Sequence, residues 1–121
     1  MIQKIKENRD FHRAYRRGKC AISPALITYA VVKRGGGLRV GITTSKKIGG
    51  AVQRNRARRV IRAAVRALNL DMNRGYDIIF VARSKTTRCK SWQLEPLIKQ
   101  RLTEAGVINA EETIDISDKA L

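Results

Sequence analysis

Residues 43–68, TTSKKIGGAVQRNRARRVIRAAVRAL, limit most strongly what this chain can fold into. Apolar residues recur at spacings of three and four from Ala57 to Leu68, which is the period of one face of an α-helix. Eight basic residues and no acidic residue occur between Lys46 and Arg66. The stretch therefore predicts a helix over residues 51–68 that packs an apolar stripe on a sheet and presents a basic face.

The basic face requires a negatively charged partner, because like charges spaced along one helix repel each other. The imbalance extends beyond this helix. No acidic residue occurs between Asp10 and Asp71, and the 121-residue chain has 26 basic and 10 acidic residues, a net charge of +16. Such a field attracts polyanions, most obviously the phosphate backbone of a nucleic acid.

The remaining patterns predict one α+β or α/β domain with helices packed on a small sheet. The expected order is helix, strand, strand, helix, strand and helix, over residues 8–17, 25–33, 38–44, 51–68, 76–83 and 93–105. The three glycines at 35–37 predict the tip of an antiparallel hairpin between the first two strands. The nearly continuous apolar run at 76–83 predicts a central strand covered on both faces. A short extra strand near residues 20–22 also fits.

Local signals set the expected boundaries. Asn8 is expected to cap the first helix, and Asn69 to cap the end of the basic helix. Pro96 would break a helix interior, so we expect it near the first turn of the last helix or at a kink. Residues 1–106 are expected to form a single domain that binds nucleic acid, and residues 107–121 a poorly ordered acidic tail.

Three aromatic residues lie among basic residues. Phe11 and Tyr15 share one face of the first helix, and Tyr29 lies in the first strand. They can be ordinary core contacts or stacking surfaces for unpaired bases, and both interpretations stay open. Because aromatic residues make up only 5% of the chain, we expect a small cleft for a few nucleotides and no broad platform.

Catalysis by the protein's own side chains is not expected. His12 is the only histidine, so no acid–base pair of a simple ribonuclease exists. The body of the chain has no carboxylate cluster suited to two metal ions. Cys20 and Cys89 lack metal-site spacing and are expected to be reduced thiols. A self-sufficient ribonuclease using His12 and a DNA-binding protein stay open as alternatives.

Membrane insertion is not expected either. No apolar run approaches the roughly 20 residues that a membrane span needs. The first ten residues carry charge from position 4 onwards and contain no apolar stretch, so we expect no signal peptide and a cytoplasmic location.

The segment SKKIGGAVQRNRARRVIRAA, residues 45–64, resembles the signature of the bacterial ribonuclease P protein subunit. Residues 54–56 match its Arg-Asn-Arg element. The segments NRDFHRAYRRG, LITYAVV, LRVGITTSKK and GYDIIFVAR resemble the flanking elements in the same order, so the likeness covers about residues 4 to 106. Gly50 and the acidic tail depart from the pattern.

The resemblance implies a two-layer α/β sandwich with a small mixed sheet, of the type also found in a ribosomal-protein domain, the S5 domain 2-like fold. It also implies a left-handed β–α–β crossover around the basic helix. General packing rules favour the right-handed form, so this expectation rests on the family alone.

The resemblance also implies the function. In this family a large RNA holds Mg²⁺ and removes the 5′ leader of precursor tRNA, and the protein binds both RNAs without an obligatory protein partner. The residues implied for the catalytic RNA are Lys46, Lys47, Arg54, Asn55, Arg56, Arg58, Arg59, Arg62 and Arg66. Those implied for the leader cleft are Phe11, Arg13, Tyr15 and Tyr29. A ribosome-associated or general RNA-binding module without a role in cleavage is the alternative.

Overall fold

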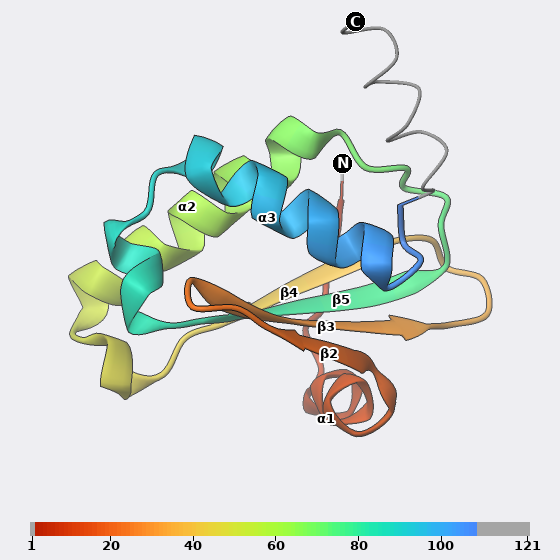
Figure 1. The fold of residues 1–121 in the computed structure, drawn as a ribbon. Helices are drawn as coiled ribbons and strands as arrows, with labels where there is room; N and C mark the ends of the chain where they lie inside the picture. The colour runs from red at the N-terminus through yellow and green to blue at the C-terminus, as the bar shows by residue number, and fades with distance from the viewer. Residues whose placement is uncertain (1, 109–121) are drawn as a thin grey trace, which may run out of the picture.

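The computed structural model describes residues 2–108 and contains five strands and three α-helices (Figure 1). The strands are β1 (Gln3–Lys4), β2 (Lys19–Ile22), β3 (Leu26–Val32), β4 (Arg39–Thr43) and β5 (Tyr76–Ala82). The helices are α1 (Asn8–Arg17), α2 (Ala51–Leu68) and α3 (Ser91–Glu104), with the 3₁₀ turns η1 (Lys46–Ile48) and η2 (Ser84–Arg88).

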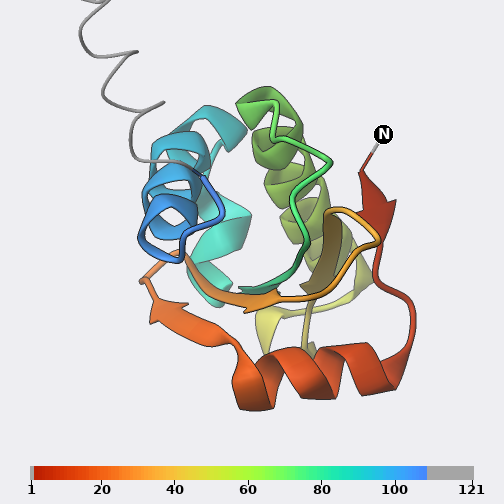
Figure 2. The same cartoon turned by 90° about the vertical axis from the view of Figure 1, so that its right-hand side faces the viewer.

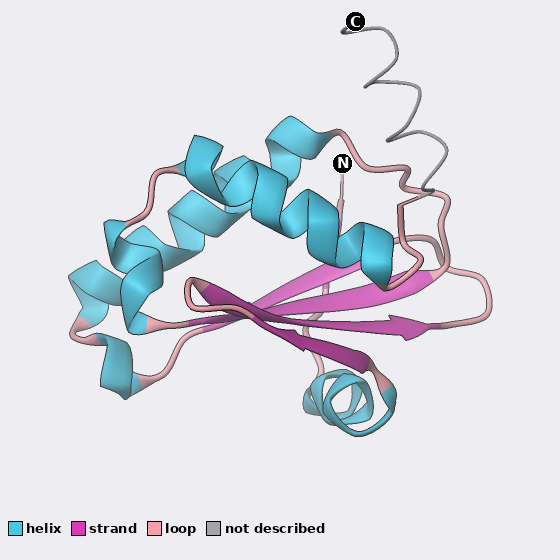
Figure 3. Ribbon diagram, in the orientation of Figure 1, coloured by secondary structure: helices cyan, strands magenta, loops and turns pink. Residues whose placement is uncertain are grey.

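The strands form one mixed sheet in the order β1-β4-β5-β3-β2. The strands β1, β4 and β5 are parallel, whereas β3 is antiparallel to both β5 and β2. The helices α2 and α3 cover one face, and α1 lies across the other (Figures 1 and 3). The predicted mixed sheet is confirmed, and α1 adds a partial third layer to the two layers expected.

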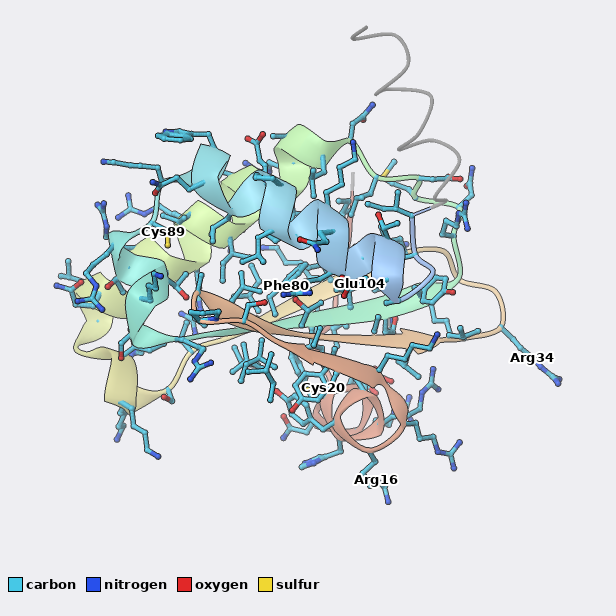
Figure 4. All side chains as sticks on the ribbon, viewed as in Figure 1. Arg16, Cys20, Arg34, Phe80, Cys89 and Glu104 are labelled. Atoms are coloured by element: carbon cyan, nitrogen blue, oxygen red, sulfur yellow. The ribbon has the colours of Figure 1, made fainter. Side chains whose placement is uncertain are left out.

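Strand β5 is the central strand, as its apolar run predicts. Its residues Ile78, Ile79 and Phe80 are completely buried. Ile78 and Phe80 belong to the main core, where Phe80 lies on the side of the sheet that faces α2 and α3 (Figure 4), while Ile79 belongs to a smaller core with Ala14 of α1. The side chains from Ile78 to Phe80 thus alternate between two cores, which explains why this part of the strand is entirely apolar.

The predicted hairpin between residues 25–33 and 38–44 is wrong, because β5 lies between β3 and β4. Tyr29 and Gly41 both pair in register with Ile79, one from each side. The glycines at 35–37, with φ values of 64°, 76° and 69°, instead carry the chain around the entry to β5. The Leu38 amide donates to the Met72 carbonyl at 2.9 Å, and a Cβ on Gly37 would lie 2.6 Å from that oxygen.

The connection β4–α2–β5 is left-handed. Seen with the helices above the sheet and both strands running away from the viewer, β5 lies to the left of β4 (Figure 2). General packing rules would have given the opposite hand. The expectation drawn from the family resemblance is therefore confirmed.

Helix α2 spans the predicted residues 51–68 and buries the predicted stripe. Ala57, Ile61, Ala64 and Val65 are buried in the main core with residues of α3 and the sheet. Asn69 ends the helix in the left-handed region at φ 51°, as expected.

Several expected details differ. Asn8 is the first helical residue of α1 and Glu7 is its N-cap, without a side-chain hydrogen bond. Pro96 lies in the second turn of α3. Strand β1, which has only two residues, was not predicted, whereas β2 confirms the extra strand near residues 20–22.

The folded part continues past residue 106. Val107 is 3% exposed and its amide donates to the Leu102 carbonyl at 2.9 Å, which completes the C-terminal turn of α3 around Gly106. The remainder of the predicted tail, residues 109–121, lies outside the described residues.

Asp77, a fully buried carboxylate, links three parts of the fold. Arg39 of β4 donates to it through Nε at 2.9 Å and Nη2 at 2.7 Å, and the Lys33 ammonium lies 3.2 Å away. Arg39 also reaches Asp10 of α1 at 3.4 Å. Burial alone would raise the pKa of Asp77, but the hydrogen bonds from Arg39 and Lys33 outweigh it and lower that pKa below its ordinary value.

We predict that Asp77→Asn destabilises the fold at neutral pH by roughly 3–5 kcal/mol, because it removes the carboxylate that the largely buried Lys33 and Arg39 share. The folded-state pKa of Asp77 lies below the unfolded value near 3.9. Its stabilisation is therefore complete above that value and is lost as the pH falls through the folded-state pKa. Urea unfolding of both proteins at pH 7 and pH 3 should show the difference shrinking at pH 3.

Glu7→Gln is the control, since it removes the exposed pair with Arg9 and should change the unfolding free energy by less than about 1 kcal/mol. An Asp77→Asn effect that stays constant between the two pH values would contradict the assignment.

Candidate nucleic-acid interface

The basic side of α2 divides into two rows. Arg58, Arg62 and Arg66, each one turn apart, line a cavity of about 550 Å³ at the edge of the sheet formed by β1 and β4. Apolar side chains form much of the remaining wall of this cavity: Ile2, Ile5, Phe11, Val40, Ile42, Val65, Leu70 and Met72. A row of guanidinium groups beside an apolar wall can hold phosphates and also contact sugars or bases.

The second row faces α3. Arg56 and Arg59 line a shallower hollow of about 290 Å³ with Cys89 and Lys90. The Arg56 Nε donates to the Thr87 carbonyl at 2.7 Å, so this side chain also fastens α2 to η2. Arg59 has no such contact among the described residues and is exposed. The two arginines thus differ in how much of their donor capacity remains for a ligand.

The entry to α2 adds a third group of donors. Lys46, Lys47 and Asn55 are exposed around it, and the first turn of the helix has no acidic residue. Its N-cap is Gly50, which has no side chain to accept a hydrogen bond, so the first helical amides have no capping group. Arg54 Nη1 donates to the Gly49 carbonyl at 3.1 Å and holds the turn in place. The positive end of the helix dipole therefore adds to the field of the lysines.

The aromatic residues lie on the opposite face of the sheet, between α1 and β3. The rings of Tyr15 and Tyr29 meet edge to face, with centroids 5.0 Å apart and an interplanar angle of 74°. Tyr15 is 38% exposed, whereas Tyr29 is half-buried against Ala14 and its neighbours in the small core. Tyr29 therefore packs on the small core, while Tyr15 packs edge to face on Tyr29 and keeps an accessible surface. Base stacking by these rings stays a prediction.

Phe11 connects the aromatic face with the arginine row. It packs directly over Gly41 of β4, where an added Cβ would lie 2.8 Å from the ring. It also lines the cavity that holds Arg58, Arg62 and Arg66. The two predicted sets of residues therefore meet at the β4 edge, which no spacing along the sequence indicated.

Cys20 has a neighbour that sequence analysis did not identify. It pairs in register with Tyr29 across β2 and β3. A hydrogen bond with Cys20 and then burial raise the pKa of the Tyr29 phenol above 10.0, so Tyr29 is a neutral ring at physiological pH.

Arg13 was expected in the same cleft as the aromatic residues, but it does not line that cleft. It lines a different cavity together with Arg17 of α1 and residues near the turn between β3 and β4. His12 is exposed on α1. Within residues 2–108 no three His, Cys, Asp or Glu side chains are grouped so that they can hold a metal ion, and none of the described helices is long and apolar enough to cross a membrane.

Known proteins are similar to this chain in sequence and in fold. The profile of a family described as Ribonuclease P matches residues 2–106. A relative from Clostridium botulinum (strain 657 / Type Ba4), described as "Ribonuclease P protein component", is 36% identical over 107 residues, covering 88% of this chain and 96% of the relative. A relative of the same description from Pelotomaculum thermopropionicum has the same identity and coverage.

Solved structures agree with these relatives. The RNase P protein of Staphylococcus aureus superposes with a TM-score of 0.73 at 29% identity, covering 90% of this chain and all of that one. The RNase P protein of Thermotoga maritima gives a TM-score of 0.71 over 84% of this chain and 96% of that one, and at 22% identity it supports the fold alone. The likeness to the ribosomal-protein domain stays a prediction.

Proposed function

This chain belongs to the ribonuclease P protein family, and we propose that it is the protein subunit of that ribonucleoprotein endonuclease. In this role it binds the catalytic RNA and the 5′ leader of precursor tRNA, and it assists removal of the leader to give the mature 5′ end. The observation that carries the proposal is the row Arg58, Arg62 and Arg66 beside the apolar wall at the β4 edge. A general RNA-binding module would not account for the family match over residues 2–106.

The two surfaces suit different parts of the RNA. The arginine rows on α2 and the lysines of η1 at its entry offer a concentrated group of cations for the folded backbone of the catalytic RNA. The Tyr15 and Tyr29 pair offers ring surface for unpaired bases, as a single-stranded leader requires. Phe11 lies where these two surfaces meet, so a precursor bound at one surface can be oriented by the RNA bound at the other.

The bond-breaking chemistry is assigned to the RNA. Mg²⁺ that the holoenzyme needs would be held mainly by RNA phosphates, and the protein's cations lower the electrostatic cost of bringing two RNAs together. We expect this complex to work in the cytoplasm without an obligatory protein partner.

The central test is precursor tRNA cleavage by the catalytic RNA at low Mg²⁺, with and without the protein. We expect the protein to raise the cleavage rate, and the gain to shrink as Mg²⁺ is increased, because divalent ions then provide the same screening. Polylysine at equal charge concentration is the control. Equal rates with the protein, with polylysine and with no addition would refute the proposed role.

A second prediction concerns Arg62→Ala. Loss of one phosphate contact should flatten the slope of log K against log salt for binding of the catalytic RNA by about 0.7–0.9. Fluorescence anisotropy over a salt series measures the slope. Arg16→Ala, an exposed arginine on α1 that points away from the sheet, should keep the wild-type slope (Figure 4). An unchanged slope for Arg62→Ala would remove it from the RNA contact surface.

A third prediction concerns Tyr15. Tyr15→Ala should weaken holoenzyme binding of precursor tRNA by about 1–3 kcal/mol, since stacking on one base is lost. Tyr15→Phe keeps the ring and should bind like the wild type. Mature tRNA lacks the leader and should show no difference among the three proteins. The leader assignment fails if Tyr15→Ala weakens mature tRNA binding to the same extent.

A further inference from the structure

A third cavity, of about 600 Å³, lies on the side of α1 away from the aromatic pair. It opens between α1 and the turn that joins β3 to β4. Seven residues line it: Arg13, Arg17, Val31, Val32, Lys33, Arg34 and Arg39. Five of the seven are basic and none is acidic. Apart from Arg13, none of them was predicted to contact RNA.

The inner part of this cavity is built from cations that are already fixed in place. Lys33 and Arg39 share the buried carboxylate of Asp77, and Arg39 also reaches Asp10. The Lys33 and Arg39 side chains are only 10% and 25% exposed, so they are held rigidly and need little reordering to meet a ligand. Each has more N–H donors than these carboxylates use.

The outer part consists of three arginines without a carboxylate partner among the described residues. Arg13 and Arg17 lie one turn apart on α1, and Arg34 lies in the turn between β3 and β4, from which its side chain extends outward (Figure 4). Among residues 2–108, Asp77 and Asp10 are the only carboxylates paired with the lining cations, so the five basic residues that line the cavity are matched by two acidic ones. The cavity therefore keeps an excess of three positive charges.

We propose that this cavity is a second anchor for an RNA strand and binds a phosphodiester group. Guanidinium groups from two elements match the several oxygens of a phosphate, and the exposed Val32 beside them suits the apolar part of a ribose. This inference rests on the proposed function at one point, because it assumes that the phosphodiester group belongs to one of the RNAs of the complex.

The position of the cavity supports this ligand. Arg13 and Arg17, which line it, each lie two residues from Tyr15, so they are on roughly the opposite side of α1, a helix about 10 Å in diameter. A strand whose bases stack on the pair brings its backbone within reach of the cavity after a few nucleotides. The 5′ leader and the catalytic RNA offer the same phosphodiester chemistry, so the experiment distinguishes them.

The test uses the double variant Arg17→Gln and Arg34→Gln in the full-length protein. Both side chains are exposed and make no hydrogen bond in residues 2–108, so the fold is kept, which thermal unfolding verifies. Arg16→Gln is the matched control, because it removes the same charge from the neighbouring exposed position of α1 (Figure 4).

The first readout needs no RNA. Pyrophosphate is titrated into the isolated protein while backbone amide NMR signals are followed. The amides around Arg17 and Arg34 should shift in the wild type and in Arg16→Gln, and should not shift in the double variant. An absence of these shifts in the wild type would overturn the proposal, and this result does not depend on whether the protein stimulates cleavage.

The second readout uses the holoenzyme with precursor tRNAs of long and short leaders, and separately the catalytic RNA alone. The double variant should bind its RNA roughly tenfold more weakly at 0.1 M salt and lower the salt slope by about 1.4, the value for two contacts to a single strand. A loss confined to the long leader identifies the leader as the ligand, and a loss with the catalytic RNA identifies that RNA. Affinities equal to those of Arg16→Gln for all three RNAs would overturn the proposal.

Discussion

The buried carboxylate of Asp77 is the interaction on which the arrangement of this molecule depends. In a chain with a net charge of +16, three strands and α1 converge at one end of the sheet and bring Lys33 and Arg39 into its interior. Asp77 lies at the start of the central strand and neutralises part of that charge, and Arg39 carries the connection on to Asp10 of α1. One acidic side chain is thereby linked, through Arg39 and Asp10, to the helix that lies across this face of the sheet.

The elements themselves were predictable because their signals are local. The period of apolar residues, together with the glycines before it, predicted the approximate extent of α2, and the nearly continuous apolar run predicted the central position of β5. The strand order was not predictable, because the insertion of β5 between β3 and β4 depends on pairing between segments that are more than thirty residues apart. Strand β1 has only two residues, too few to show the alternation by which a strand is recognised in a sequence. It is placed by its pairing with β4 alone.

The candidate sites divide in the same way. The basic face of α2 follows from one helix and was predicted from spacing, whereas its division into a row at the β4 edge and a row facing α3 depends on which neighbours cover each side. The aromatic pair forms where α1 packs on β3. Arg13 lies on another side of α1, so it lines a different cavity. The cavity around Arg17 and Arg34 joins segments whose proximity only the folded sheet creates.

The insertion of β5 also has a consequence for synthesis on the ribosome. Until residues 76–82 have emerged, β3 and β4 have no partner on their facing edges, while the whole of α2 is already outside. Local contacts form quickly and distant strand pairs slowly, so the nascent chain presents its basic helix to solvent before the sheet that supports it can close. The ribosome is itself rich in RNA. Pairing of β5, the last strand to emerge, is therefore the step that gives the exposed basic segment a defined shape beside that RNA.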